Sequence, residues 1–181
     1  MRISFDQKIS RSIYETTKKS WVLRHVGVFF ADDLIWLLIG VIGGLVLFSA
    51  QFVSSGIHTG MFVLFLLTLC IPWFVSALIA RFIQRPRPYK AQGYTPIIKP
   101  FIETSAFPSS HATFSFAMLG FVMAGSIHEL FWVVLIGVLL VSFGRVMVGV
   151  HRISEVVTGA IIGGVVGYVL TRFLIWILPM V

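Results

Sequence analysis

The stretch HRISEVVTGAIIGGVVGYVLTRFLIWIL, residues 151–178, decides the fold class of this chain. After Glu155 it is apolar apart from a few small or polar side chains, and Arg172 is its only charged residue. A bilayer core about 30 Å thick is crossed by a helix of about 20 mostly apolar residues. The stretch therefore predicts a transmembrane helix whose first turn is charged.

The composition of the whole chain agrees with this interpretation. Of its 181 residues, 57% are hydrophobic and only 12% are charged, whereas soluble domains carry about 25% charged residues. This excludes a soluble cytosolic enzyme and a disordered chain. The one cysteine, Cys70, cannot form an internal disulfide, which excludes a secreted disulfide scaffold. No alternation of apolar and polar residues supports a membrane barrel.

Four more apolar stretches of suitable length precede the one quoted. They run from about Leu34 to Phe52, Met61 to Phe82, His111 to Ile127 and Leu130 to Val150. The last two are separated by a short turn near Ser126, which predicts a helical hairpin. We therefore expect an all-α fold, a polytopic membrane bundle of about five transmembrane helices.

Residues 1–31 have a different pattern. Apolar side chains recur every fourth position with basic side chains between them: Phe5, Ile9 and Ile13, with Lys8 and Arg11. This spacing predicts an amphipathic helix lying on the membrane surface, with a break near Trp21; a partly ordered tail is the alternative. The chain thus divides into an interfacial segment, 1–31, and a transmembrane domain, 32–181. Asp32 and Asp33 would begin the first span, where acidic residues suit the helix dipole.

Glycines recur at a spacing of four in the last stretch, at Gly159, Gly163 and Gly167. Small residues at this spacing let two helices approach closely. We expect them to serve packing inside the bundle rather than dimerisation.

Polar residues gather where the spans begin or end. If the spans alternate in direction, the ends of the second and fourth lie on the same side as the starts of the third and fifth. The residues at these four ends are Arg81, Arg85, Arg87, Ser109, Ser110, His111, Arg145, His151 and Glu155. Ionisable residues at membrane depth are costly and usually functional, so we expect one site there.

These residue types fit phosphoryl transfer. Arginines offer paired, fixed donors to phosphate oxygens, and Ser109 and Ser110 open a helix whose first N–H groups favour an anion. Two histidines can divide nucleophilic attack and proton transfer. Glu155 follows His151 by one helical turn, so it can hold one imidazole nitrogen and leave the other available. No carboxylate cluster suits a metal, and the chemistry needs neither a metal nor another cofactor.

The same residues resemble the three signatures of the type 2 phosphatidic acid phosphatase (PAP2) superfamily: K-x6-R-P, P-S-G-H and S-R-x5-H-x3-D. The matching segments are Arg85-Pro86-Arg87-Pro88, Pro108-Ser109-Ser110-His111 and Arg145-x5-His151-x3-Glu155. The resemblance implies a phosphohistidine on His151, with His111 as general acid. It also implies phosphate binding by Arg87, Ser109, Ser110 and Arg145.

Several positions depart from the signatures. Ala80 stands where the superfamily has lysine; the adjacent Arg81 is a candidate substitute, although it points about 100° away around an ideal helix. Ser110 replaces glycine, Gly144 replaces serine, and Glu155 replaces aspartate with a longer arm. Both histidines and both main arginines are present.

The resemblance implies an integral-membrane lipid phosphatase, similar to small bacterial members that act as undecaprenyl-diphosphatases. A polyprenyl diphosphate held in the bilayer is the favoured substrate, and phosphatidate or phosphatidylglycerophosphate is the alternative. A non-catalytic lipid-binding or transport relative is a further possibility, whereas five spans argue against a vanadate-dependent haloperoxidase.

The net charge of +7 is then assigned to membrane lipids and substrate, not to nucleic acid. We expect a multi-pass protein of the plasma (inner) membrane. The sequence leaves open which side the site faces and which oligomer forms.

Overall fold

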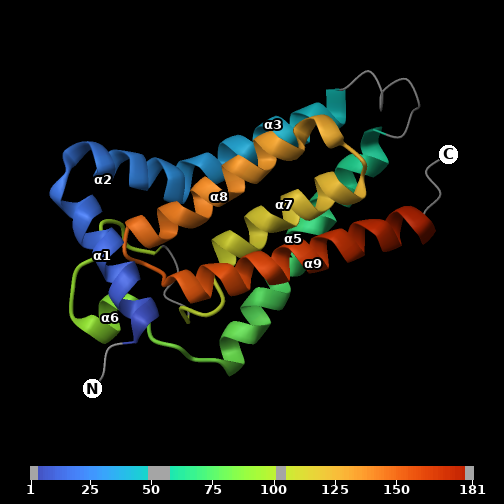
Figure 1. The fold of residues 1–181 in the computed structure, drawn as a ribbon. Helices are drawn as coiled ribbons and strands as arrows, with labels where there is room; N and C mark the ends of the chain where they lie inside the picture. Colours follow the sequence, from blue (N-terminus) through green and yellow to red (C-terminus); the bar gives the residue numbers. More distant parts are fainter. Residues whose placement is uncertain (1–3, 49–57, 101–104, 178–181) are drawn as a thin grey trace.

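The computed structural model describes residues 4–48, 58–100 and 105–177, and these contain helices and no strand. The helices form an elongated bundle with the two chain ends at opposite ends of it (Figure 1). They are α1 (Phe5–Lys19), α2 (Trp21–Val28), the π-helical turn η1 (Phe29–Asp33), α3 (Leu34–Phe48), α5 (His58–Phe82), α6 (Pro88–Gln92), α7 (Ser110–Ala124), the short η2 (His128–Leu130), α8 (Phe131–Met147) and α9 (Ile153–Ile177). The expected all-α bundle is confirmed.

The N-terminal helix begins and ends where its residues predict. Ser4 and Gln7 form a reciprocal capping box that satisfies free N–H groups of the first turn. The helix stops at Lys19, and the Ser20 side chain accepts a hydrogen bond from the Leu23 N–H to start α2. The expected break near Trp21 is therefore present.

The first apolar helix starts earlier than the sequence pattern indicates. Residues Trp21–Phe48 form one 28-residue apolar helix, because the two aspartates lie in a π-helical turn inside it and do not start it. The predicted start at Leu34 was therefore too late. The predicted end at Phe52 lies outside the described residues, as does Leu178 at the end of the fifth stretch. Because Trp21–Phe48 is one continuous helix, α1 is followed directly by one candidate membrane span.

Three helices in the described part of the chain are long and apolar enough to cross a bilayer: Trp21–Phe48, Thr59–Phe82 and Ile153–Ile177. The other two expected spans are shorter, with 15 residues in α7 and 17 in α8. At 1.5 Å per residue these are about 22 and 26 Å long. They are joined through η2 as the predicted hairpin, and glycines at 125 and 149 follow their last turns.

The repeated glycines of α9 serve packing inside the bundle, as expected. A Cβ at Gly163 would lie 2.0 Å from the Thr113 carbonyl oxygen, and one at Gly167 would lie 2.8 Å from that of Ala117. The two helices run side by side along the middle of the molecule (Figure 1). Glycine is required at these positions because the α7 backbone occupies the space of any side chain.

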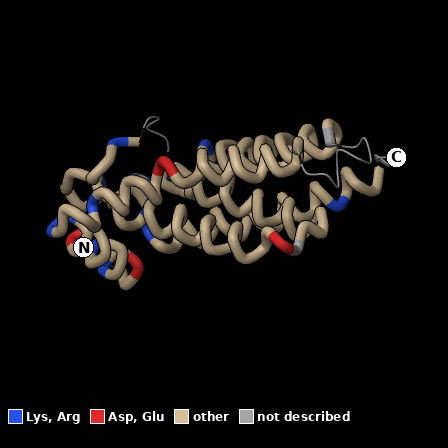
Figure 2. Tube along the Cα trace, turned by 90° about the horizontal axis from the view of Figure 1, so that it is seen from above, with Lys and Arg blue, Asp and Glu red and all other residues tan. Residues whose placement is uncertain are grey.

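Charged residues concentrate at the end of the bundle that carries the N-terminus, and the long middle part is nearly free of them (Figure 2). The N-terminal helix α1 lies across this end and buries Ser10, Tyr14 and Thr17. Phe5, by contrast, is 78% exposed and is available to a bilayer surface. Membrane contact by residues 1–31 stays a prediction.

Candidate active site

The structure brings most of the predicted site residues to the charged end of the bundle. They come from four places in the chain: Arg87 precedes α6; Ser109, Ser110 and His111 start α7; Arg145 lies in the last turn of α8; His151 and Glu155 lie before and in the first turn of α9. Hydrogen bonds and ion pairs connect these segments, as described below.

His151 has a defined orientation. Its Nδ1 lies 3.0 Å from the Ala106 carbonyl oxygen and 3.3 Å from Oε2 of Glu155. Both partners are acceptors, so Nδ1 carries the proton and donates it. The other nitrogen, Nε2, then has a lone pair, and Nη1 of Arg87 lies 3.4 Å from it. A buried imidazole with an unprotonated Nε2 beside an arginine is suited to attack a phosphorus atom bound by that arginine.

Glu155 is fully buried and uses both of its oxygens. Oε1 accepts from Arg152 Nη1 at 2.6 Å and lies 3.3 Å from Arg85 Nε. Oε2 accepts from the Arg152 backbone N–H at 3.0 Å in addition to His151. The carboxylate is thus fixed from several sides. Although glutamate is one methylene longer than the aspartate of the signature, it still reaches Nδ1 of His151.

Arg145 is buried, and one edge of its guanidinium is occupied. Its Nη1 donates to the Ala31 carbonyl oxygen at 3.2 Å and to Oδ1 of Asp32 at 2.5 Å. The same Oδ1 lies 3.9 Å from Nε2 of His111. Asp32 therefore contacts both Arg145 and His111.

Three buried polar atoms of the site have no hydrogen-bond partner among the described residues: Nε of Arg145, Nε of Arg152 and Oγ of Ser109. Ser110 differs, because its hydroxyl lies 3.4 Å from that of Ser76. Buried donors are nearly always paired in proteins, so an unpaired one indicates a position where a ligand or a water molecule binds. A phosphate oxygen is an acceptor that would satisfy Nε of Arg145 and Oγ of Ser109.

Arg81 is not brought to this cluster. Its side chain is exposed on α5, and no hydrogen bond or ion pair joins it to a described residue. Arg85, one turn further on, contacts Glu155 instead. Arg81 is adjacent in sequence to the position of the absent lysine, but its side chain has no contact with the other site residues in the structure.

Sequence reasoning did not place Asp6, Arg152 or Asp32 in this region. Arg152 is 2% exposed and bound to Glu155. Its position three residues before Glu155 is the signal that could have found it. For Asp6 and Asp32 the partners are far away in sequence, and no local spacing points to them.

The N-terminal helix supplies caps to α9. Oδ1 of Asp6 accepts from the Ser154 N–H at 3.2 Å, and Oγ of Ser10 accepts from the Ile153 N–H at 3.1 Å. Asp6 also accepts from the Ser154 hydroxyl at 2.6 Å. These contacts satisfy N–H groups that a helix start leaves free. Because Glu155 lies in this first turn, α1 helps to fix the orientation of His151.

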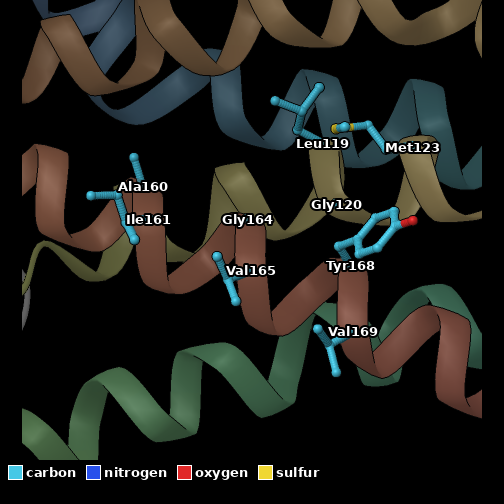
Figure 3. A pocket seen from close by; sticks show the side chains of 9 residues that line it. All are labelled: Leu119, Gly120, Met123, Ala160, Ile161, Gly164, Val165, Tyr168 and Val169. Atoms are coloured by element: carbon cyan, nitrogen blue, oxygen red, sulfur yellow. The ribbon is translucent and has the colours of Figure 1, made fainter.

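An apolar groove of about 360 Å³ lies between α7 and α9, further along the bundle. Figure 3 shows the residues that line it, among them Leu119, Met123, Ile161 and Tyr168. Gly120 and Gly164 also line it. Leu119 follows His111 by eight residues on the same helix, or about 12 Å. The groove and the charged end are therefore both formed by α7 and α9.

Burial lowers the pKa of His151, which lies in the connection between α8 and α9, to about 4. The hydrogen bond to Glu155 opposes this change, and the charges of Arg87 and Arg145 add to it. A lowered pKa keeps the imidazole neutral at every pH well above 4, which is the state a nucleophile needs.

A direct titration of the histidines should show the lowered pKa of His151. In detergent micelles with labelled histidine, the His151 resonance, identified by its absence in His151→Asn, should shift with a midpoint near pH 4. The reference is the same protein unfolded in denaturant, where histidine titrates near pH 6.5. A folded-state midpoint at or above the unfolded one would contradict the assignment.

A bundle of apolar helices that holds two histidines, buried arginines and unpaired donors at one end defines a membrane protein with a site for an anionic group. The sequence profile of the PAP2 superfamily matches residues 60–178. The chain belongs to this superfamily, and the resemblance stated from the motifs is confirmed. By class it is therefore a membrane phosphatase, a phosphoric ester hydrolase.

The fold is also similar to a solved structure. The crystal structure of the first transmembrane PAP2-type phosphatidylglycerolphosphate phosphatase from Bacillus subtilis superposes with a TM-score of 0.66. The match covers 93% of this chain and 83% of that one, at 19% sequence identity. No curated protein sequence matches the chain.

Proposed function

We propose that this chain hydrolyses a polyprenyl diphosphate, such as undecaprenyl diphosphate, in the plasma (inner) membrane, as a multi-pass protein. The reaction proceeds through a phosphohistidine on His151. Nε2 attacks the terminal phosphorus while the bond to the leaving oxygen breaks, and His111 donates a proton to that oxygen. Water then attacks the phosphohistidine and releases phosphate.

The observation that carries this proposal is that Arg145 Nε and Ser109 Oγ are buried without a partner on segments bonded to His151 and Glu155. The His151 N–H donates to the Arg145 carbonyl oxygen at 3.3 Å, and the Ser109 N–H donates to that of Glu155 at 3.1 Å. Arg87 lies 3.4 Å from the nucleophilic nitrogen, so a phosphate bound to Arg87 is close to Nε2. Arg145, Ser109 and Ser110 complete the binding groups. Glu155 holds the Nδ1 proton and orients the ring, the role of the carboxylate in hydrolytic triads.

Phosphatidylglycerophosphate is the second candidate substrate. It is favoured by the fold similarity to a protein described as a phosphatidylglycerolphosphate phosphatase. The two candidates differ in the leaving group, which is a phosphate for the diphosphate and an alkoxide for the phospholipid.

Phosphate release by the purified protein across a panel of lipids tests the proposal. The panel contains undecaprenyl diphosphate, undecaprenyl phosphate, phosphatidate and phosphatidylglycerophosphate. The highest kcat/KM should be found for the diphosphate. A preference for phosphatidylglycerophosphate would favour the second candidate, and binding of these lipids without release would identify a non-catalytic relative.

The apolar groove between α7 and α9 fits the tail of such a lipid. A Cβ at Gly164 would meet nothing within 4 Å, so Gly164→Leu should fold normally and fill the groove. We expect KM for the long-chain substrate to rise about 5-fold, which corresponds to roughly one buried CH₂ group of lost contact. A soluble short-chain phosphate should be hydrolysed as before.

Gly40→Leu is the matched control, because Gly40 on α3 also has open space around its missing Cβ but does not line the groove. Equal KM values for the two leucine variants would exclude the groove as the tail site.

A further inference from the structure

Asp32 is an acidic residue in the middle of an apolar helix. It lies in the π-helical turn η1 of the 28-residue helix Trp21–Phe48. A carboxylate in such a helix is costly and usually has a function, and π-helical turns inside α-helices occur frequently at functional sites. The side chain is 45% exposed and is directed to the charged end, because its partners there are Arg145 and His111.

Gly144 explains how η1 reaches the site. A Cβ at position 144 would lie 2.6 Å from the Ala31 backbone nitrogen and 2.7 Å from the Phe30 carbonyl carbon. The backbone of η1 therefore packs directly on α8, one residue before Arg145. This contact puts both the Ala31 carbonyl oxygen and the Asp32 carboxylate on Nη1 of Arg145. The departure from the serine of the resembled signature thus makes room for an acid from another helix.

The contacts divide the Arg145 guanidinium into two edges. Nη1 is held by η1, at 2.5 Å from Asp32 and 3.2 Å from Ala31. Nε has no partner among the described residues and is left for substrate. Asp32 also puts a negative charge 3.9 Å from Nε2 of His111, where it offsets the positive charge of the nearby arginine. The carboxylate is a hydrogen-bond acceptor on one side of the imidazole of the proposed general acid.

We propose that Asp32 is a positioning residue of the phosphatase site. It fixes Arg145 through Nη1 so that Nε faces the phosphate, and it orients the imidazole of His111, the proposed proton donor to the leaving oxygen. This inference rests on the proposed phosphatase function. It adds to the site a residue that lies outside all three signature motifs.

The test compares Asp32→Asn with Asp33→Asn. The two variants remove one charge each from adjacent positions in η1. Asp33 is exposed, and no hydrogen bond or ion pair joins it to a described residue of the site. Each variant is assayed with an alkyl phosphate, whose leaving oxygen needs a proton, and with p-nitrophenyl phosphate, whose leaving group does not. Thermal unfolding midpoints are measured in parallel.

We expect Asp32→Asn to lower kcat for the alkyl phosphate about 10- to 100-fold, and for the aryl phosphate distinctly less. The loss reaches at most the lower end of a full proton-transfer contribution, about 10²-fold, because His111 itself is retained. Asp32→Glu should restore part of the loss, and Asp33→Asn should behave as wild type. Gly144→Ser, which pushes η1 away from α8, should repeat the dependence on leaving group.

Other outcomes overturn the proposal. Equal losses on both substrates with a lowered unfolding midpoint would make Asp32 a structural residue only. A lower KM or a higher rate in Asp32→Asn would show that the carboxylate competes with phosphate. An unchanged rate would remove any role. Wild-type protein without turnover on either substrate would instead refute the phosphatase function itself, together with this inference.

Discussion

Replacing His151 by asparagine should reduce phosphate release by at least about 10³-fold, the scale expected when a catalytic nucleophile is removed. The ring is 3% exposed and is held through Nδ1, so its Nε2 is the nitrogen available for attack. Asparagine is smaller and still polar, and its amide can donate to Ala106 or Glu155. The folded protein should therefore persist while the nucleophile is lost. Initial rates of phosphate release in detergent micelles measure the effect.

His25→Asn is the matched control for this substitution. His25 is exposed on α2, and its ring contacts the Trp21 carbonyl oxygen and side chain, away from the cluster. It should retain wild-type rates. If His151→Asn kept more than a tenth of the wild-type rate with a normal unfolding midpoint, His151 would not be the nucleophile.

Replacing Glu155 by alanine should lower both stability and activity. The carboxylate is fully buried, and its loss leaves the guanidinium of Arg152, itself 2% exposed, without its closest anion. Removing one partner of a buried ion pair typically costs about 3–5 kcal/mol. The same change releases the Nδ1 side of His151, so kcat should also fall, by about 10²- to 10⁴-fold. Reversible unfolding by SDS in mixed micelles, followed by tryptophan fluorescence, measures the stability change.

Glu15→Ala is the matched control for charge and residue type. Glu15 pairs with Arg11 on the surface of α1, where the two side chains are 39% and 40% exposed. An exposed pair contributes at most about 1 kcal/mol, and Glu15 does not touch the site. A loss of less than about 1 kcal/mol for Glu155→Ala as well would mean that the buried ion network does not stabilise the start of α9.

The sequence predicted the parts of this molecule that depend on local spacing. The apolar runs gave the bundle, the glycines of α9 gave its packing on α7, and the interval between His151 and Glu155 gave one helical turn. These features need only the helical repeat and the thickness of a bilayer. The motif spacing also gave the correct family.

The remaining features depend on contacts between distant segments. Asp32 was expected to start a helix, because an acid before an apolar run usually does so; it instead lies inside one, stabilised by Arg145 and admitted by Gly144. Arg81 was chosen by position along one helix, whereas the neighbouring turns place Arg85 on Glu155. Asp6 caps a helix that begins 147 residues later; no pattern within α1 indicates such a partner.

The central claim is a covalent phosphoryl group on His151, and trapping that group tests it most directly. The purified protein is mixed with ³²P-labelled undecaprenyl diphosphate and quenched in base within one turnover, because a phosphohistidine survives base and is lost in acid. We predict label on the peptide that contains His151, decay of the label in a chase with unlabelled substrate, and no label in His151→Asn. Turnover without label on this peptide, or label on another residue, would contradict the mechanism.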